Sequence, residues 1–152
     1  MVNNVFLDLE ETVINNWDEG FLVHTSKVRD FLKAQNVKGW TVFSFAVWNA
    51  SDVAVFQKRH QRFLEKALDC PVLSCPSCQD FMECDTEKTG VRFDSLTDFI
   101  SIRGKVGAFT NWCAVNHSGQ HSVLVDDVVP NAVWTNKDTN TTVEFVNVLQ
   151  LS

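Results

Sequence analysis

The sequence predicts an α/β protein in which a mainly parallel sheet lies between layers of helices. Short apolar runs of strand length alternate along the chain with longer stretches whose apolar residues recur every three or four positions. Strands and helices that alternate in this way build parallel sheets covered by helices. The chain has 152 residues, 45% hydrophobic and 21% charged, which fits a globular protein with one core. We therefore expect a single domain over residues 1–152.

The first part of the chain predicts two strands separated by a helix. The apolar run Val5-Phe6-Leu7 predicts a strand that ends at Asp8. Thr25 or Ser26 can cap a helix with one apolar face. Residues 41–46 are rich in Val, Phe and Thr and predict a second buried strand.

The middle of the chain predicts a helix, a short strand and then a loop. Asn49 or Ser51 can cap a helix that runs to about residue 68, and residues 71–74 predict a third strand. Residues 70–92 include four cysteines and several charges without clear periodicity. We interpret this segment as an insertion or long loop within the domain, a place where a partner protein could bind.

The last part predicts two helices and two strands. Helical spacing appears at residues 96–100 and again at 105–114, with Gly104 between them. Residues 122–125 predict a buried strand that ends on a pair of aspartates. Residues 141–149 predict a final strand, although the apolar pattern at its end also fits a short buried helix.

Polar side chains follow three of these strands, and their meeting is the main chemical signal. They are Asp8, Ser44 and the pair Asp126 and Asp127. A single strand that ends in Asp usually marks only a turn or a cap. Two adjacent carboxylates are costly at such a place unless a cation neutralises them, and carboxylate oxygens are the ligands that Mg²⁺ prefers. Because parallel strands place ligand sites outside their carboxyl ends, we expect a magnesium site there.

The charge of the chain limits its partners. The formal net charge is −6, which opposes strong nucleic-acid binding without sequence preference. A phosphorylated ligand is still compatible, because a bound metal supplies positive charge. No apolar run approaches the roughly 18 residues of a membrane span, so we expect no membrane association. The N-terminus lacks a signal-peptide pattern, and we expect a cytoplasmic protein.

Four cysteines fall within fifteen positions, at Cys70, Cys75, Cys78 and Cys84. Their spacing, C-x4-C-x2-C-x5-C, can supply a structural Zn²⁺ site with four thiolates. The outer spacings are irregular, however, and reduced buried cysteines explain the same residues. Both interpretations stay open, and Cys113 is expected in the core.

These motifs together resemble those of the haloacid dehalogenase (HAD) superfamily of hydrolases. The segment Val-Phe-Leu-Asp-Leu-Glu-Glu-Thr at residues 5–12 is similar to its first motif, Asp-x-Asp-x-Thr, in the style of the small carboxy-terminal-domain-type phosphatases. Ser44 matches the second motif and Asp126-Asp127 the fourth, and Pro130-Asn131 is similar to the sequence that follows it in those phosphatases. Lys105 is our choice for the third motif, with Lys88 and Arg103 as competitors. The resemblance implies a Rossmann-like three-layer sandwich with a minimal cap and a Cys-containing insertion.

The resemblance also implies a function, a Mg²⁺-dependent phosphatase that works through an aspartyl-phosphate. Asp8 would be the nucleophile and Glu10 the general acid and base. Ser44 and Lys105 would hold the phosphoryl oxygens. The metal ligands would be Asp8, the backbone carbonyl of Glu10, Asp126 and Asp127. A nucleotide, a nucleic-acid end or a phosphoprotein would be the substrate, since small caps accompany large substrates in this superfamily.

Glu10 is the main departure from the family pattern, which has Asp at that place. Its carboxylate is one methylene farther from the backbone, and a misplaced acid/base group can slow turnover by roughly 10²–10⁴-fold. We expect slow hydrolysis. The alternative is a catalytically weak or inactive HAD-like module that binds a partner.

Overall fold

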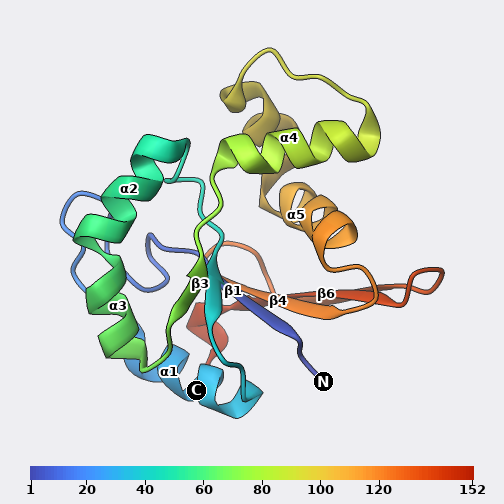
Figure 1. Cartoon of the computed structure of the whole chain (residues 1–152). Coiled ribbons are helices and arrows are strands. Elements are labelled where there is room, and N and C mark those ends of the chain that lie inside the picture. Colours follow the sequence, from blue (N-terminus) through green and yellow to red (C-terminus); the bar gives the residue numbers. More distant parts are fainter.

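The computed structural model describes all residues 1–152 and contains a six-stranded, mostly parallel sheet between helices (Figure 1). The strand order is β3-β2-β1-β4-β6-β5, and only β5 runs antiparallel to its neighbour. The strands are β1 (Asn4–Leu7), β2 (Trp40–Val42), β3 (Val72–Ser74), β4 (His121–Asp126), β5 (Ala132–Asn136) and β6 (Thr141–Asn147). The helices are α1 (Thr25–Gln35), α2 (Ala50–Arg59), α3 (Gln61–Leu68), α4 (Cys78–Thr89), α5 (Leu96–Asn116) and the 3₁₀ turn η1 (Val148–Gln150). This arrangement confirms the predicted α/β class and is compatible with a Rossmann-like sandwich.

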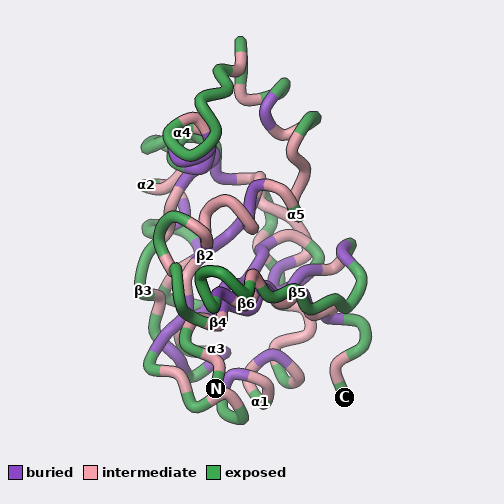
Figure 2. Tube along the Cα trace, turned by 90° about the vertical axis from the view of Figure 1, so that its right-hand side faces the viewer, coloured by how far each residue is buried: buried purple, intermediate pink, exposed green.

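Two core clusters cover the two faces of the sheet. Successive side chains of a strand point to opposite faces, so Val5 and Leu7 pack with α1, α2 and α3, whereas Phe6 packs with α4 and α5. Figure 1 shows these two groups of helices on opposite sides of the strands. The central strands are buried in Figure 2, and β5 is exposed at the edge of the sheet. Continuous apolar runs in the sequence therefore mark strands covered on both faces.

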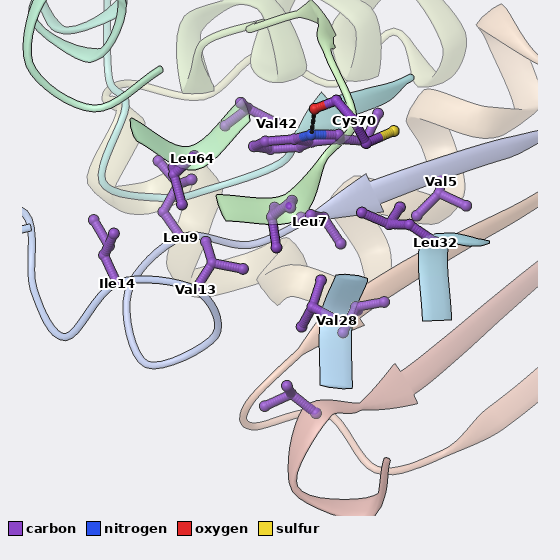
Figure 3. Packing of buried hydrophobic residues seen from close by; sticks show 14 of the residues in the cluster. Val5, Leu7, Leu9, Val13, Ile14, Val28, Leu32, Val42, Leu64 and Cys70 are labelled. Carbon is purple, nitrogen blue, oxygen red and sulfur yellow. Dashed lines mark hydrogen bonds between the residues drawn. The ribbon is translucent and has the colours of Figure 1, made fainter. Parts of the chain in front are cut away.

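The cluster on the α1–α3 side is closed by a hydrogen bond as well as by packing. The fully buried indole of Trp40 donates from Nε1 to the carbonyl oxygen of Cys70 over 3.0 Å (Figure 3). A buried indole N–H without an acceptor is costly, so this bond fixes the start of β2 against the end of α3.

Several element boundaries differ from the sequence-based predictions. The expected single helix from residue 50 to 68 is two helices, α2 and α3, that meet at His60. The N-cap of α1 is His24, in the left-handed conformation, instead of Thr25 or Ser26. Asn49 caps α2 as predicted, by accepting a hydrogen bond from the backbone N–H of Asp52.

The prediction of a long loop was wrong for most of the segment 70–92. Residues 78–89 form α4, whose N-terminus carries a complete capping box between Ser77 and Asp80. The helix has only a narrow apolar face, Cys78, Phe81 and Cys84, and the cysteines in it suggested a metal-binding loop. β5 was also missed, because it follows a turn after the aspartate pair and four of its five residues are exposed.

A buried charge cluster joins α4 to α5. Asp85 is fully buried on α4, and its carboxylate accepts hydrogen bonds from Arg103 Nε and Nη2 at 2.8 and 3.2 Å and from the side-chain amide of Asn111 at 2.5 Å. Directly after Arg103, α5 bends at Gly104, whose φ of 65° and ψ of −176° suit glycine. The cluster therefore fixes α5 on both sides of its bend.

Replacing Asp85 by Ala should destabilise the protein by about 3–5 kcal/mol, since it leaves Arg103 and Asn111 without their buried acceptor. Urea unfolding followed by circular dichroism measures this loss. Glu87→Ala, at an exposed position on the same helix, is the matched control and should change stability by less than about 0.5 kcal/mol. Equal effects of the two substitutions would show that the cluster does not hold α4 to α5.

Candidate active site

Asp8 stands where the chain direction across the sheet reverses. It follows β1, which has β2 on one side and β4 on the other, and its backbone N–H donates to the carbonyl of Val125 over 3.0 Å. The chain winds from β1 through β2 to β3 and then crosses to β4 on the opposite side of β1. In open α/β sheets a crevice forms outside the strand ends at such a point. Asp8 is placed in this crevice by topology alone.

The other strand-end residues meet Asp8 there. A cavity of about 460 Å³ is lined by Asp8, Glu10, Glu11, Ser44, Phe45, Ala46, Lys105, Asp126, Asp127, Val128 and Val129. Asp126 ends β4, and its Oδ2 accepts the backbone N–H groups of Val128 and Val129, each over 2.9 Å. Ser44 is buried after β2, with its hydroxyl oxygen accepting the N–H of Ala46 over 3.1 Å. The convergence expected from the sequence is therefore present.

Lys105 reaches the same place from α5. Its Nζ lies 3.0 Å from Asp8 Oδ1 and 3.1 Å from Asp126 Oδ1, and 4.9 Å from the centre of the Phe45 ring. The two competing cations do not line the cavity: Arg103 is bound to Asp85, and Lys88 is exposed in the last turn of α4. Among the three candidates, only Lys105 contacts the aspartates.

Burial and this ion pair set the protonation of the three groups. Burial raises the pKa of Asp8 to about 7, although Lys105 opposes the shift, and the nearby Asp126 adds to it. Burial alone would raise the pKa of Asp126 as well, but Lys105 and the two backbone N–H groups lower it on balance. Burial disfavours the charged form of Lys105, yet the two carboxylates raise its pKa above the usual value. Lys105 and Asp126 are thus the firmly charged pair, and Asp8 titrates.

The residues present suit a hard divalent cation. Asp8, Asp126 and Asp127 each offer an oxygen, and these oxygens lie within 4.8 Å of one another. Asp126 Oδ1 is buried, and the only donor near it is the Lys105 ammonium, 3.1 Å away. A buried carboxylate oxygen with a single donor keeps a lone pair that can bind a metal ion. The donor set, made only of oxygens, fits Mg²⁺.

Glu10 lines the cavity, but its side chain is hydrogen-bonded to the backbone of the loop at residues 15–20. Its Oε2 accepts the backbone N–H of Trp17 over 2.8 Å, and Oε1 makes no hydrogen bond. The carboxylate is carried on a tight turn in which the N–H groups of Thr12, Val13 and Ile14 all point to the carbonyl of Leu9. One carboxylate oxygen of Glu10 is therefore free for proton transfer.

Two contacts in the site were missed by reasoning from the sequence. The hydroxyl of Thr12, fully buried, donates to Asp8 Oδ2 over 3.4 Å, and Phe45 places its ring over Lys105. The Thr of the first motif was available as a signal for the first contact. Nothing in the sequence indicates the second, because it depends on how α5 bends.

The four cysteines are not brought together. Cys70 and Cys75 belong to the α1–α3 side of the sheet, while Cys78 is in the cluster on the opposite face. Cys84 faces α5, where its Sγ lies near the Asn111 carbonyl and the Asn116 amide. The aspartates are the one group of three or more His, Cys, Asp or Glu residues close enough to hold an ion. The four cysteines are not close enough to share one Zn²⁺ ion, so the structure favours the second interpretation, in which they are mainly packing residues.

Comparison of the chain with known protein families, with curated proteins and with solved structures gives no significant match. None of the helices has the length and apolar character that crossing a membrane requires.

The raised pKa of Asp8 predicts a pH dependence of stability in chelator-treated protein. The unfolded chain loses this proton near pH 4, whereas the folded protein keeps it until about pH 7. Asp8 therefore contributes to the free energy of unfolding at low pH, and this contribution is lost as the pH rises to about 7. Between pH 5 and pH 8 the free energy of unfolding should fall by about 2–3 kcal/mol. Asp8→Asn should lack this component, which urea unfolding at the two pH values measures.

Asp138→Asn, at an exposed loop position, is the control and should follow the wild type. A wild type and an Asp8→Asn variant with the same change between pH 5 and pH 8 would contradict the assignment.

Proposed function

We propose that this protein is a Mg²⁺-dependent phosphomonoester hydrolase of the HAD type, active in the cytoplasm. The observation that carries the proposal is the contact of one lysine with two aspartates from different strands, at the reversal point of the sheet. A nucleophile, a cation for phosphoryl oxygens and a set of oxygen ligands lie in one cavity. The strand order and the two layers of helices support a Rossmann-like three-layer sandwich for the finer fold.

In this proposal Asp8 attacks phosphorus with a carboxylate oxygen. The new bond joins Asp8 to phosphorus, and the bond between phosphorus and the leaving oxygen breaks. Lys105 and the Ser44 hydroxyl bind the oxygens of the transferring group and balance their growing charge. Lys105 is fixed for this task before substrate arrives, because its two ion pairs hold the ammonium in place.

Glu10 takes part in both proton transfers of the reaction. In its protonated form it gives a proton to the leaving oxygen, and in its charged form it takes one from the water that releases phosphate from Asp8. Asp8, Asp126, Asp127 and the backbone carbonyl of Glu10 are the proposed ligands of Mg²⁺, which would neutralise phosphate charge. Nucleotides, nucleic-acid ends and phosphoproteins are the substrates that the family resemblance suggests.

A second candidate function is a binding module that has kept the site without turnover. The hydrogen bond from Trp17 to Glu10 favours it, since this bond draws one oxygen of the longer side chain toward the loop at residues 15–20. Such a module would bind a phosphorylated partner through the same cation and metal. The segment 70–92, now seen to contain α4, would be a surface for a protein partner.

Phosphate release from phenyl phosphate with Mg²⁺ tests the choice. We expect slow release by the wild type, its loss after addition of chelator, and a decrease of at least ~10³-fold in Asp8→Asn, which removes the nucleophile. Glu10→Asp should raise kcat by roughly 10-fold or more, because it restores the shorter acid/base group.

Asp138→Asn again serves as the control and should retain wild-type turnover. Hydrolysis by the Asp8→Asn variant at the wild-type rate would contradict the aspartyl-phosphate mechanism. An inactive wild type with an active Glu10→Asp variant would establish the binding module instead.

A further inference from the structure

An apolar groove of about 320 Å³ lies between α5 and the edge of the sheet. Val106 and Thr110 of α5 form one wall, and Ala132 and Trp134 of β5 form the other. Val129, Pro130 and Phe145 complete the lining, so the groove contains no charged side chain. Trp134 and Val106 are 51% and 50% exposed, which is unusual for large apolar groups that share one concave surface.

The strand register shows that Trp134 belongs to the groove. Trp134 lies opposite Val143 and Ala132 opposite Phe145 in the antiparallel pair β5–β6. Val143 and Phe145 are core residues on the α4–α5 side of the sheet. Because directly opposed residues of a pair point to the same face, Ala132 and Trp134 face the α5 side too. β5 extends this apolar face beyond the core, where its residues are exposed (Figure 2).

The groove borders the candidate active site. Val129 lines both cavities, and the neighbouring residues Lys105 and Val106 each line one of them. A phosphoryl group held by Lys105 would thus have an apolar groove next to its site. The backbone N–H groups of Val128 and Val129 are occupied by Asp126, so this border offers no free donors from those two residues to a polar ligand.

The charge of the active-site cavity selects what can occupy the groove. Five carboxylates line that cavity, Asp8, Glu10, Glu11, Asp126 and Asp127, against the single cation Lys105. A divalent ion offsets only part of this negative charge. A polyanionic leaving group, such as an oligonucleotide, would meet repulsion there and would find no basic side chain in the groove.

We infer that the groove binds the apolar, uncharged leaving group of a small phosphomonoester, so that the substrate class is an aryl or alkyl phosphate in place of the nucleotides, nucleic-acid ends and phosphoproteins that the family resemblance suggests. This inference rests on the proposed phosphatase function. The phosphate lies at Asp8 and Lys105, and the apolar part lies between Val106 and Trp134. The volume of the groove, about 320 Å³, suits a group the size of an aromatic ring.

The experiment compares phenyl phosphate with 2-naphthyl phosphate, whose leaving groups have similar basicity but different apolar area. In the wild type we expect a KM at least ~5-fold lower for the naphthyl ester with a similar kcat, because the groove contact is made equally before and during reaction. Trp134→Ser and Val106→Ser should each remove most of this difference, by raising the KM of the naphthyl ester more than the KM of phenyl phosphate. Phe63→Ser, at an exposed aromatic residue on α3, should retain it.

Binding measured by calorimetry separates this inference from the proposed function. With Mg²⁺ present, naphthylmethylphosphonate should bind at least ~5-fold tighter than benzylphosphonate to the wild type, and the difference should vanish in Trp134→Ser. This result supports the groove even if no ester is hydrolysed, an outcome that would overturn only the catalytic proposal. Equal binding of the two phosphonates, or better turnover of a 5′-phosphorylated oligonucleotide than of naphthyl phosphate, would overturn the groove assignment.

Discussion

The ammonium group of Lys105 between the carboxylates of Asp8 and Asp126 is the interaction on which the site depends. Two carboxylates at adjacent strand ends repel each other, and both are buried. Without a cation between them, one would have to take up a proton or the strand ends would separate. Lys105 supplies that cation, since its Nζ lies 3.0 Å from Asp8 Oδ1 and 3.1 Å from Asp126 Oδ1. The pKa of Asp8 is nevertheless raised to about 7. The site is therefore short of positive charge in a way that a divalent ion can correct.

The position of Lys105 depends on structure some distance from the site. α5 changes direction at Gly104, one residue before Lys105. The Asp85 carboxylate accepts hydrogen bonds from Arg103 on one side of this bend and from Asn111 on the other. α4 therefore has a clear structural role, since it provides the buried carboxylate that fixes the bend. A segment that looks like a loop in the sequence is, in the fold, the element that supports Lys105 in the candidate site.

Reasoning from the sequence predicted the sheet and most of the site because the signals were local. Apolar runs marked β1 and β4, and the polar residues that end them were read directly as Asp8 and Asp126. Parallel topology then implied their meeting, which the cavity confirms. Lys105 could be chosen only by resemblance, since one lysine carries little information and its contact depends on the bend of α5. α4 and β5 were missed for a related reason: the first has a narrow apolar face and the second an exposed one, so neither shows the pattern of a buried element.

Because the side chain of Glu10 is one methylene longer than that of Asp, the position of its carboxylate depends on another part of the chain. Its longer side chain reaches the backbone N–H of Trp17, so its location follows the loop at residues 15–20. Arg59 secures that loop from α2 by donating to the carbonyl of Asp18 over 2.7 Å. The His60 ring packs against Trp17 at a tilt of 53°, with 4.9 Å between ring centres. Gly20 is required beside it, since its φ is 69° and an added Cβ would lie 2.8 Å from the His60 ring. An Asp at position 10 would be too short to share this bond on the same backbone. The loop and the junction of α2 and α3 thus determine how far the Glu10 carboxylate extends into the cavity, although none of these residues contacts the aspartates.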